Sequence, residues 1–129
     1  MKRVLFVCIE NSCRSQMAEG FARKLGSGKI KAWSAGSKPS GTVNKTAAAL
    51  MKEKGVDLGA QYSKGLDRLP GGKWDCVVTM GCGEACPALP AKKRVDWSLP
   101  DPKNLPDDEF RKLRDDIESR VMALIKEIA

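Results

Sequence analysis

The sequence contains no histidine among its 129 residues. This absence excludes Ser–His–Asp triads and Cys–His nucleophile pairs, and it removes the ligand that most zinc sites use. No apolar run approaches the roughly 20 residues needed to span a membrane. The first apolar segment ends at Glu10 and Asn11, too early for a secretory signal. We therefore expect a cytoplasmic protein that does not contact a membrane.

Aromatic residues are also scarce, at 5%, and there is no stripe of alternating basic and aromatic residues, which argues against nucleic-acid binding. The formal net charge is +7, from 23 basic and 16 acidic residues. Such an excess is most simply a solvated basic surface, but it also attracts small oxyanions. Length and composition are those of a single domain over residues 1–129, and we expect a monomer.

Five cysteines are present. An odd number in a reducing compartment disfavours a framework of structural disulfides. Clustered cysteines in cytosolic proteins more often serve catalysis, redox cycling or metal binding. Cys76 lies within an apolar run, and we expect it to be a small buried hydrophobic residue.

Short apolar runs alternate with segments of helical periodicity, a pattern typical of an α/β fold with a parallel sheet. Strands are predicted at residues 4–8, 30–35, 75–80 and 94–97, and helices at residues 17–25, 43–54 and 110–128. The Gly- and Pro-rich stretches 36–42 and 81–106 are predicted to be loops around that last short strand. Because open α/β sheets bind ligands at the carboxyl ends of their strands, Cys8 and the region of Cys82 mark the expected site.

Residues 7–15, Val-Cys-Ile-Glu-Asn-Ser-Cys-Arg-Ser, lead from the first predicted strand directly into a helix. Such a turn directs main-chain N–H groups and the positive helix terminus at one point. A tetrahedral oxyanion is therefore expected to bind at Ile9, Glu10, Asn11, Ser12, Cys13 and Arg14. Arg14 adds a planar bidentate fork, and the same field favours the thiolate of Cys8, to which Ser15 could donate its hydroxyl. Chance spacing of a buried cysteine and a surface arginine is the alternative, which this context disfavours.

The segment CIENSCRSQMAEGFA resembles the active-site segment of arsenate reductases of the thioredoxin-coupled, low-molecular-weight protein tyrosine phosphatase-like family. Further matching pieces are Ser34-Ala35-Gly36, Val77-Val78-Thr79, Cys86-Pro87 and Asp101-Pro102. The resemblance implies a three-layer α/β fold whose four-stranded parallel sheet is flanked by helices. It also implies reduction of arsenate in arsenic detoxification, without a cofactor. Many members have glycine where this chain has Glu10, and we expect that carboxylate to point toward solvent.

The resemblance also implies roles for individual residues. In the family mechanism Cys8 attacks arsenate and Asp101 assists the departure of water or hydroxide. Cys82 would then attack the Cys8 sulfur, and Cys86 would resolve the Cys8–Cys82 disulfide to leave Cys82–Cys86 for thioredoxin. Because a disulfide requires close approach of its two residues, residues 81–90 are predicted to be a redox-dependent switch.

Two other functions remain open. The loop would serve a low-molecular-weight tyrosine phosphatase equally well, but Lys103 follows Asp101-Pro102 where such phosphatases usually carry an aromatic residue. A non-enzymatic metal or metalloid binder could use Cys82 and Cys86 with a third cysteine. A Cys-x3-Cys motif without histidine fits structural zinc poorly.

The electron donor and a cation are further questions that the resemblance raises. Cys82 and Cys86 are closer together than in familiar thioredoxin-coupled members, and Cys82-Gly83 also resembles relatives that use glutaredoxin, glutathione or another small thiol. Some members hold potassium beside the loop, at positions matched here by Asn11, Glu19 and Ser34. Lys64 replaces a further acidic ligand, so no metal is predicted. The family keeps Cys13 without using it as a nucleophile.

Overall fold

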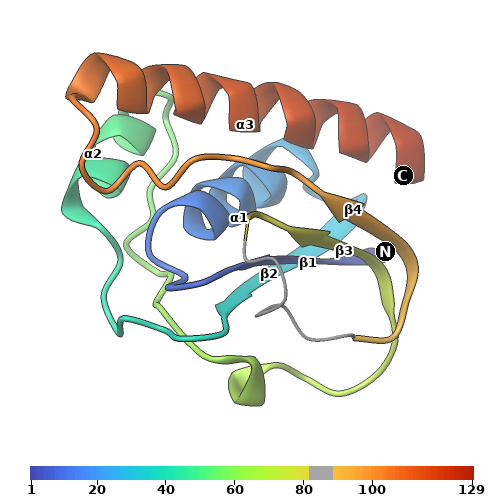
Figure 1. Ribbon diagram of the computed structural model, residues 1–129. Helices are drawn as coiled ribbons and strands as arrows, with labels where there is room; N and C mark the ends of the chain where they lie inside the picture. The colour runs from blue at the N-terminus through green and yellow to red at the C-terminus, as the bar shows by residue number, and fades with distance from the viewer. Residues whose placement is uncertain (82–88) are drawn as a thin grey trace.

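Four parallel strands form the centre of the molecule, and the computed structural model describes residues 1–81 and 89–129. The elements in chain order are β1 (Lys2–Cys8), α1 (Arg14–Leu25), β2 (Ile30–Gly36), α2 (Lys45–Lys52), the 3-10 helix η1 (Leu66–Arg68), β3 (Trp74–Thr79), β4 (Ala91–Asp96) and α3 (Asp107–Ile128). The sheet order is β2-β1-β3-β4, with every pairing parallel. The predicted α/β class and four-stranded parallel sheet are confirmed (Figure 1).

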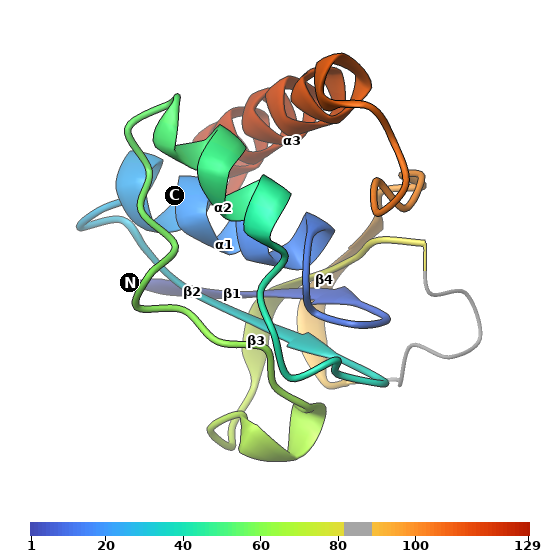
Figure 2. The same ribbon diagram turned by 90° about the vertical axis from the view of Figure 1, so that its left-hand side faces the viewer.

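The three α-helices lie over one face of the sheet, and η1 lies on the other side (Figure 2). Side chains of a strand alternate between its faces, so Val4 and Phe6 of β1 pack under the helices, whereas Leu5 and Val7 face the opposite cluster. That second cluster is closed by residues of η1 and of extended segments, among them Leu66, Leu69 and Leu89. Burial on both faces explains why β1 is a continuous apolar run rather than an alternating one.

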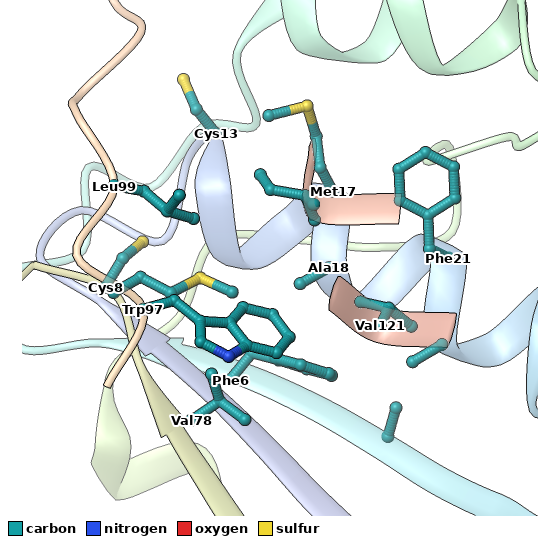
Figure 3. Packing of buried hydrophobic residues seen from close by; sticks show 14 of the residues in the cluster. Phe6, Cys8, Cys13, Met17, Ala18, Phe21, Val78, Trp97, Leu99 and Val121 are labelled. Atoms are coloured by element: carbon teal, nitrogen blue, oxygen red, sulfur yellow. The ribbon is translucent and has the colours of Figure 1, made fainter. Parts of the chain in front are cut away.

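The core beneath the helices reaches the carboxyl end of β1. Figure 3 shows Trp97 and Phe6 next to one another, and their ring centroids are 6.0 Å apart. Cys8 and Leu99 lie at the edge of the same cluster, and the sulfur of Cys13 points away from Cys8. Helix α3 contributes the predicted apolar stripe through Phe110, Leu113, Ile117, Val121, Leu124 and Ile125, all buried. Cys8, the predicted nucleophile, therefore lies at the edge of the packed core.

Several element boundaries differ from those predicted, and those of β4 and α2 have a local cause. Strand β4 begins at Ala91, three residues before the predicted start. Ala91 and Lys93 pair with β3, but Lys92 and Lys93 give the sequence no apolar signal there. Helix α2 is shorter than predicted. The helix begins after Asn44, its N-cap residue, whose side chain accepts a hydrogen bond from the amide of Ala47 (2.9 Å).

Strand β1 is the point at which the chain reverses direction across the sheet, since β2 lies on one side of it and β3 on the other. Ligands of open α/β sheets bind beyond the carboxyl ends of strands at such a point. Cys8 ends β1 and Met80 directly follows β3, so both border this position. None of the helices in the described ranges combines the length and apolar character that a membrane crossing needs.

Candidate active site

The oxyanion loop, residues 8–15, runs from the last residue of β1 to the start of α1. Its main-chain carbonyl oxygens are bound from outside by a neighbouring segment, residues 37–44. The four hydrogen bonds are Ser37 N to Cys8 O (3.3 Å), Lys38 N to Ile9 O (2.8 Å), Ser40 N to Glu10 O (3.0 Å) and Asn44 N to Ser12 O (3.1 Å). These bonds fix which way each peptide group of the loop faces.

A trans peptide points its N–H opposite to its C=O. Outward carbonyls therefore turn the N–H groups of Ile9, Glu10, Asn11 and Cys13 toward the inside of the loop. Within residues 1–81 and 89–129, none of these N–H groups donates to another atom of the protein. Several convergent N–H donors beside a helix N-terminus form an anion-binding concavity. Four of the six residues predicted to bind an oxyanion thus turn a main-chain N–H into the loop, and the binding itself stays a prediction.

Asn11 fixes the curvature of the loop. Its φ of 51° is left-handed, a conformation that asparagine tolerates better than most residues. Its side chain is fully buried, and the main-chain amide of Lys64 donates to its Oδ1 (2.9 Å). Because a main-chain N–H can only donate, this bond assigns the amide orientation, and Nδ2 faces Ser15 Oγ at 2.8 Å.

The Asn11 orientation leaves the proton of the Ser15 hydroxyl available for the next hydrogen bond. Ser15 Oγ accepts from Asn11 Nδ2 and lies 2.8 Å from Cys8 Sγ. With one lone pair occupied by Asn11, the Ser15 hydroxyl is free to donate its proton to the sulfur. A donated hydrogen bond favours a thiolate over a thiol. Ser15 therefore lies within hydrogen-bond distance of Cys8, and its role as a donor to the thiolate stays a prediction.

Arg14 is the buried cation of the loop, with 6% of its surface exposed. Its Nη1 donates to the carbonyls of Met80 (2.9 Å) and Leu99 (3.0 Å). Among the described residues, all of its hydrogen bonds come from Nη1, which leaves Nε and Nη2 as the edge for an anion. Gly81, at φ +77°, permits this arrangement because a Cβ there would lie 3.0 Å from Nη1.

Gly36 ends β2 directly against the oxyanion loop. A Cβ at this position would lie 2.5 Å from the carbonyl oxygen of Ile9 and 2.9 Å from the amide nitrogen of Asn11. Real Cβ atoms do not approach main-chain atoms so closely. The Ser34-Ala35-Gly36 motif therefore has a steric reason for its glycine.

Asp101, the predicted acid, is exposed on the segment after β4. Its Oδ1 accepts a hydrogen bond from the main-chain amide of Lys103 (3.1 Å), a local turn that aspartate commonly makes. The Lys103 ammonium lies 3.5 Å from the Glu10 carboxylate, whose side chain is 36% exposed. The expectation that Glu10 points outward is met, because its carboxylate pairs with a lysine at the surface.

The remaining described cysteines, Cys13 and Cys76, are buried. Burial raises the pKa of the Cys13 thiol from 9.0 to about 12, and the charges of Asp101 and Cys8 add to this rise. Burial in β3 likewise raises the pKa of Cys76. Both thiols stay protonated near neutral pH, as the structural roles predicted for them require.

A buried charged cluster lies beside the loop, where Asn11, Glu19 and Ser34 were matched to a cation site. Glu19 is 1% exposed; Ser34 Oγ donates to its Oε1 (2.5 Å), and Arg23 pairs with its Oε2 (2.6 Å). The Lys64 ammonium lies 3.7 Å from Glu19 Oε1. Burial lowers the pKa of Lys64, and the Glu19 charge opposes that shift. An ammonium is thus in place beside this carboxylate. The described residues hold no group of three or more Cys, Asp or Glu suited to a metal ion.

Sequence reasoning missed the polar contacts that hold the loop to residues 61–64. Gln16 Nε2 donates to Asn11 O (3.1 Å) and to Tyr62 O (3.0 Å), and Gln61 Nε2 donates to Gln16 Oε1 (2.8 Å). Glutamine following the Cys-x5-Arg-Ser motif was the only signal in the sequence. Cys82 and Cys86, and most of the predicted switch at residues 81–90, lie outside the described residues.

A cavity of about 380 Å³ opens beside the oxyanion loop. It is lined by Glu10, Ser12, Cys13, Ser40, Thr42, Val43, Asn44, Lys45, Thr46 and Lys103. No aromatic side chain belongs to this lining, as far as the described residues go. An aryl group extending from the loop would therefore find no ring to stack on.

The family model for low molecular weight phosphotyrosine protein phosphatase matches residues 3–129. A glutaredoxin arsenate reductase of Synechocystis sp. is 42% identical over 132 residues, which covers 100% of both chains. A solved structure of an arsenate reductase in the phosphate binding state has a TM-score of 0.89 at 41% identity and covers 100% of each chain. A thioredoxin-dependent arsenate reductase of Corynebacterium glutamicum has a TM-score of 0.81 at 30% identity, covering 99% of this chain and 62% of the other.

Proposed function

Since the chain belongs to the low molecular weight phosphotyrosine protein phosphatase family and falls among its arsenate reductases, we propose that it reduces arsenate to arsenite through Cys8, Cys82 and Cys86. The observation that carries the proposal is the inward set of N–H groups in the oxyanion loop, with Cys8 Sγ and Arg14 at its two ends. This arrangement suits a tetrahedral oxyanion attacked from below by a thiolate.

The first step forms a sulfur–arsenic bond. The Cys8 thiolate, held by the Ser15 hydroxyl at 2.8 Å, attacks arsenic while the bond between arsenic and one of its hydroxyl groups breaks. Asp101 in its protonated form gives that oxygen a proton, so water leaves. The loop N–H groups and Arg14 stabilise the charge on the remaining oxygens.

The second step transfers two electrons. The Cys82 thiolate attacks Cys8 Sγ, a Cys8–Cys82 disulfide forms, and the electron pair of the sulfur–arsenic bond stays on arsenic, which leaves as arsenite. Cys86 then attacks Cys82, which frees the Cys8 thiolate and leaves a Cys82–Cys86 disulfide. We propose that a thioredoxin dithiol reduces this disulfide in the cytoplasm.

The electron donor has a second candidate. The Synechocystis relative that matches over the whole chain is a glutaredoxin arsenate reductase, whereas the Corynebacterium structure is thioredoxin-dependent. The two donors differ in what they need from Cys86. A dithiol donor acts on a Cys82–Cys86 disulfide, while a glutathione-linked system can act on a mixed disulfide with fewer protein thiols.

Arsenate-dependent NADPH consumption with a complete thioredoxin or glutaredoxin system tests these proposals. Cys8→Ser and Cys82→Ser are expected to abolish turnover with either donor. Cys86→Ser should abolish thioredoxin-linked turnover only. Cys76→Ser, a change in a buried strand, is the matched control and should retain activity. Full thioredoxin-linked turnover by Cys86→Ser would remove it from the relay, and rapid aryl phosphate hydrolysis without arsenate reduction would make the chain a phosphatase.

A further inference from the structure

The segment 99–103 carries Asp101 at its midpoint, and both of its ends are tied to the oxyanion loop. At one end, the carbonyl of Leu99 accepts a hydrogen bond from Arg14 Nη1 (3.0 Å). At the other end, the Lys103 ammonium lies 3.5 Å from the Glu10 carboxylate. A short segment held at both ends has little freedom to carry its central residue away from the loop.

The two ties differ in kind. The bond from Arg14 is buried and reaches the main chain. The pair between Lys103 and Glu10 is at the surface, with side chains 59% and 36% exposed. The amide of Lys103 also donates to Asp101 Oδ1 (3.1 Å). Lys103 thus contacts the acid through its main chain and the oxyanion loop through its side chain.

We propose that Glu10 and Lys103 are positioning residues whose ion pair holds Asp101 at the oxyanion loop. The inference rests on the proposed function, in which Asp101 protonates the departing oxygen. The pair lies on the cavity beside the loop, since both residues line it. Glu10 therefore contributes to the reaction despite placing a negative charge beside an anion site.

A direct effect of the two charges on arsenate binding predicts a different result from a role in positioning Asp101. As an isolated charge, Glu10 repels an arriving anion and Lys103 attracts it. Removing Glu10 should then improve arsenate binding, and removing Lys103 should weaken it. Positioning requires that both changes slow the chemical step. The effect on KM and the effect on the maximal rate thus separate the two explanations.

The experiment follows the loss of free thiols in a single turnover of the reduced protein at saturating arsenate. Glu10→Gln and Lys103→Gln should each lower the maximal rate roughly twofold to fivefold, the range expected for an exposed ion pair. The arsenate concentration for half-maximal rate should fall with Glu10→Gln and rise with Lys103→Gln. The charge-exchanged double variant E10K/K103E should recover most of the maximal rate. Glu118→Gln breaks a comparable pair with Lys54 (3.0 Å) away from the site and should change neither quantity.

An Asp101→Asn background completes the test. There the substitution Glu10→Gln should cause no further loss of rate, because the group that it positions is absent. An equal loss in both backgrounds, or unchanged rates in the single variants, overturns the positioning role while leaving the proposed function intact. If Asp101→Asn does not slow the reaction, the acid assignment and the positioning role are both wrong.

Discussion

Asn11→Asp is the substitution that tests the active site most directly. The change keeps the size of the side chain but replaces the donor Nδ2 by an oxygen. The amide of Lys64 (2.9 Å) continues to hold the first oxygen, so the second one stays 2.8 Å from Ser15 Oγ. The Ser15 hydroxyl must then donate to the new carboxylate, and Cys8 Sγ loses its hydrogen bond.

The expected size of the effect follows from two contributions. Loss of a hydrogen bond to a charged group costs about 1.5–3 kcal/mol. Two contacts of 2.8 Å each join the new carboxylate oxygen to the sulfur through Ser15 Oγ. At that separation and an effective dielectric constant near 20, the repulsion is about 3 kcal/mol. Together they reach about 4.5–6 kcal/mol, which corresponds to a loss of Cys8 reactivity of roughly a thousandfold or more. Ser15→Ala removes only the hydrogen bond and should cost roughly 10- to 100-fold.

The assay is alkylation of Cys8 by iodoacetamide at neutral pH, followed by mass spectrometry, with single-turnover arsenate reduction alongside. Asn44→Asp is the matched control, because aspartate caps helix α2 as well as asparagine does; its stability should match that of the wild type. An Asn11→Asp variant that folds and alkylates within tenfold of the wild-type rate would show that Asn11 does not orient Ser15.

Further outcomes follow from the same geometry. Gly36→Ala should lower the free energy of unfolding by about 1–3 kcal/mol, because its Cβ would lie 2.5 Å from a loop carbonyl oxygen. It should also weaken phosphate binding, measured by calorimetry. In the control Gly71→Ala a Cβ meets nothing within 4 Å, so stability and phosphate binding should stay unchanged. Lys64→Met should lower the free energy of unfolding, measured in urea, by about 1–3 kcal/mol, because the buried Glu19 loses one of its partners. The double variant Lys64→Met/Glu19→Gln should recover part of that loss if the two charges interact. Cys13 should resist iodoacetamide at pH 8 in the folded protein but react in urea. Because its pKa rises from 9.0 to about 12 on folding, the stability that it contributes is present below pH 9 and is lost as pH rises toward 12, as urea midpoints across that range would report.

The fold and the loop were predictable because their signals are local. The apolar run of β1 and the stripe of α3 identify their elements without reference to the rest of the chain. The spacing from Cys8 to Arg14 is likewise contained within one turn between a strand and a helix. The fold class could therefore be predicted from the sequence alone, and so could the strand–loop–helix connection that carries Cys8 and Arg14.

The supports of the loop could not be derived in this way. The amide of Lys64 reaches Asn11 across 53 residues, and Gln61 reaches Gln16 across 45. Polar pairs at such separations have no periodicity, and their partners are often main-chain groups that every residue possesses. The Glu10–Lys103 pair is similar, since the sequence marks each residue as a departure from the family pattern but gives no sign that the two meet. Only the folded chain brings each pair together.

The Lys64 ammonium has a consequence for how the protein meets changing surroundings. A cation bound from solution occupies its site in proportion to its concentration, so a protein that depends on one follows the salt content of its medium. A cation built into a side chain is present once in every molecule, whatever ions surround it, while it stays protonated. The Lys64 ammonium lies next to the buried Glu19. The charge of that carboxylate is therefore balanced by the amino-acid sequence itself and not by the ions in solution.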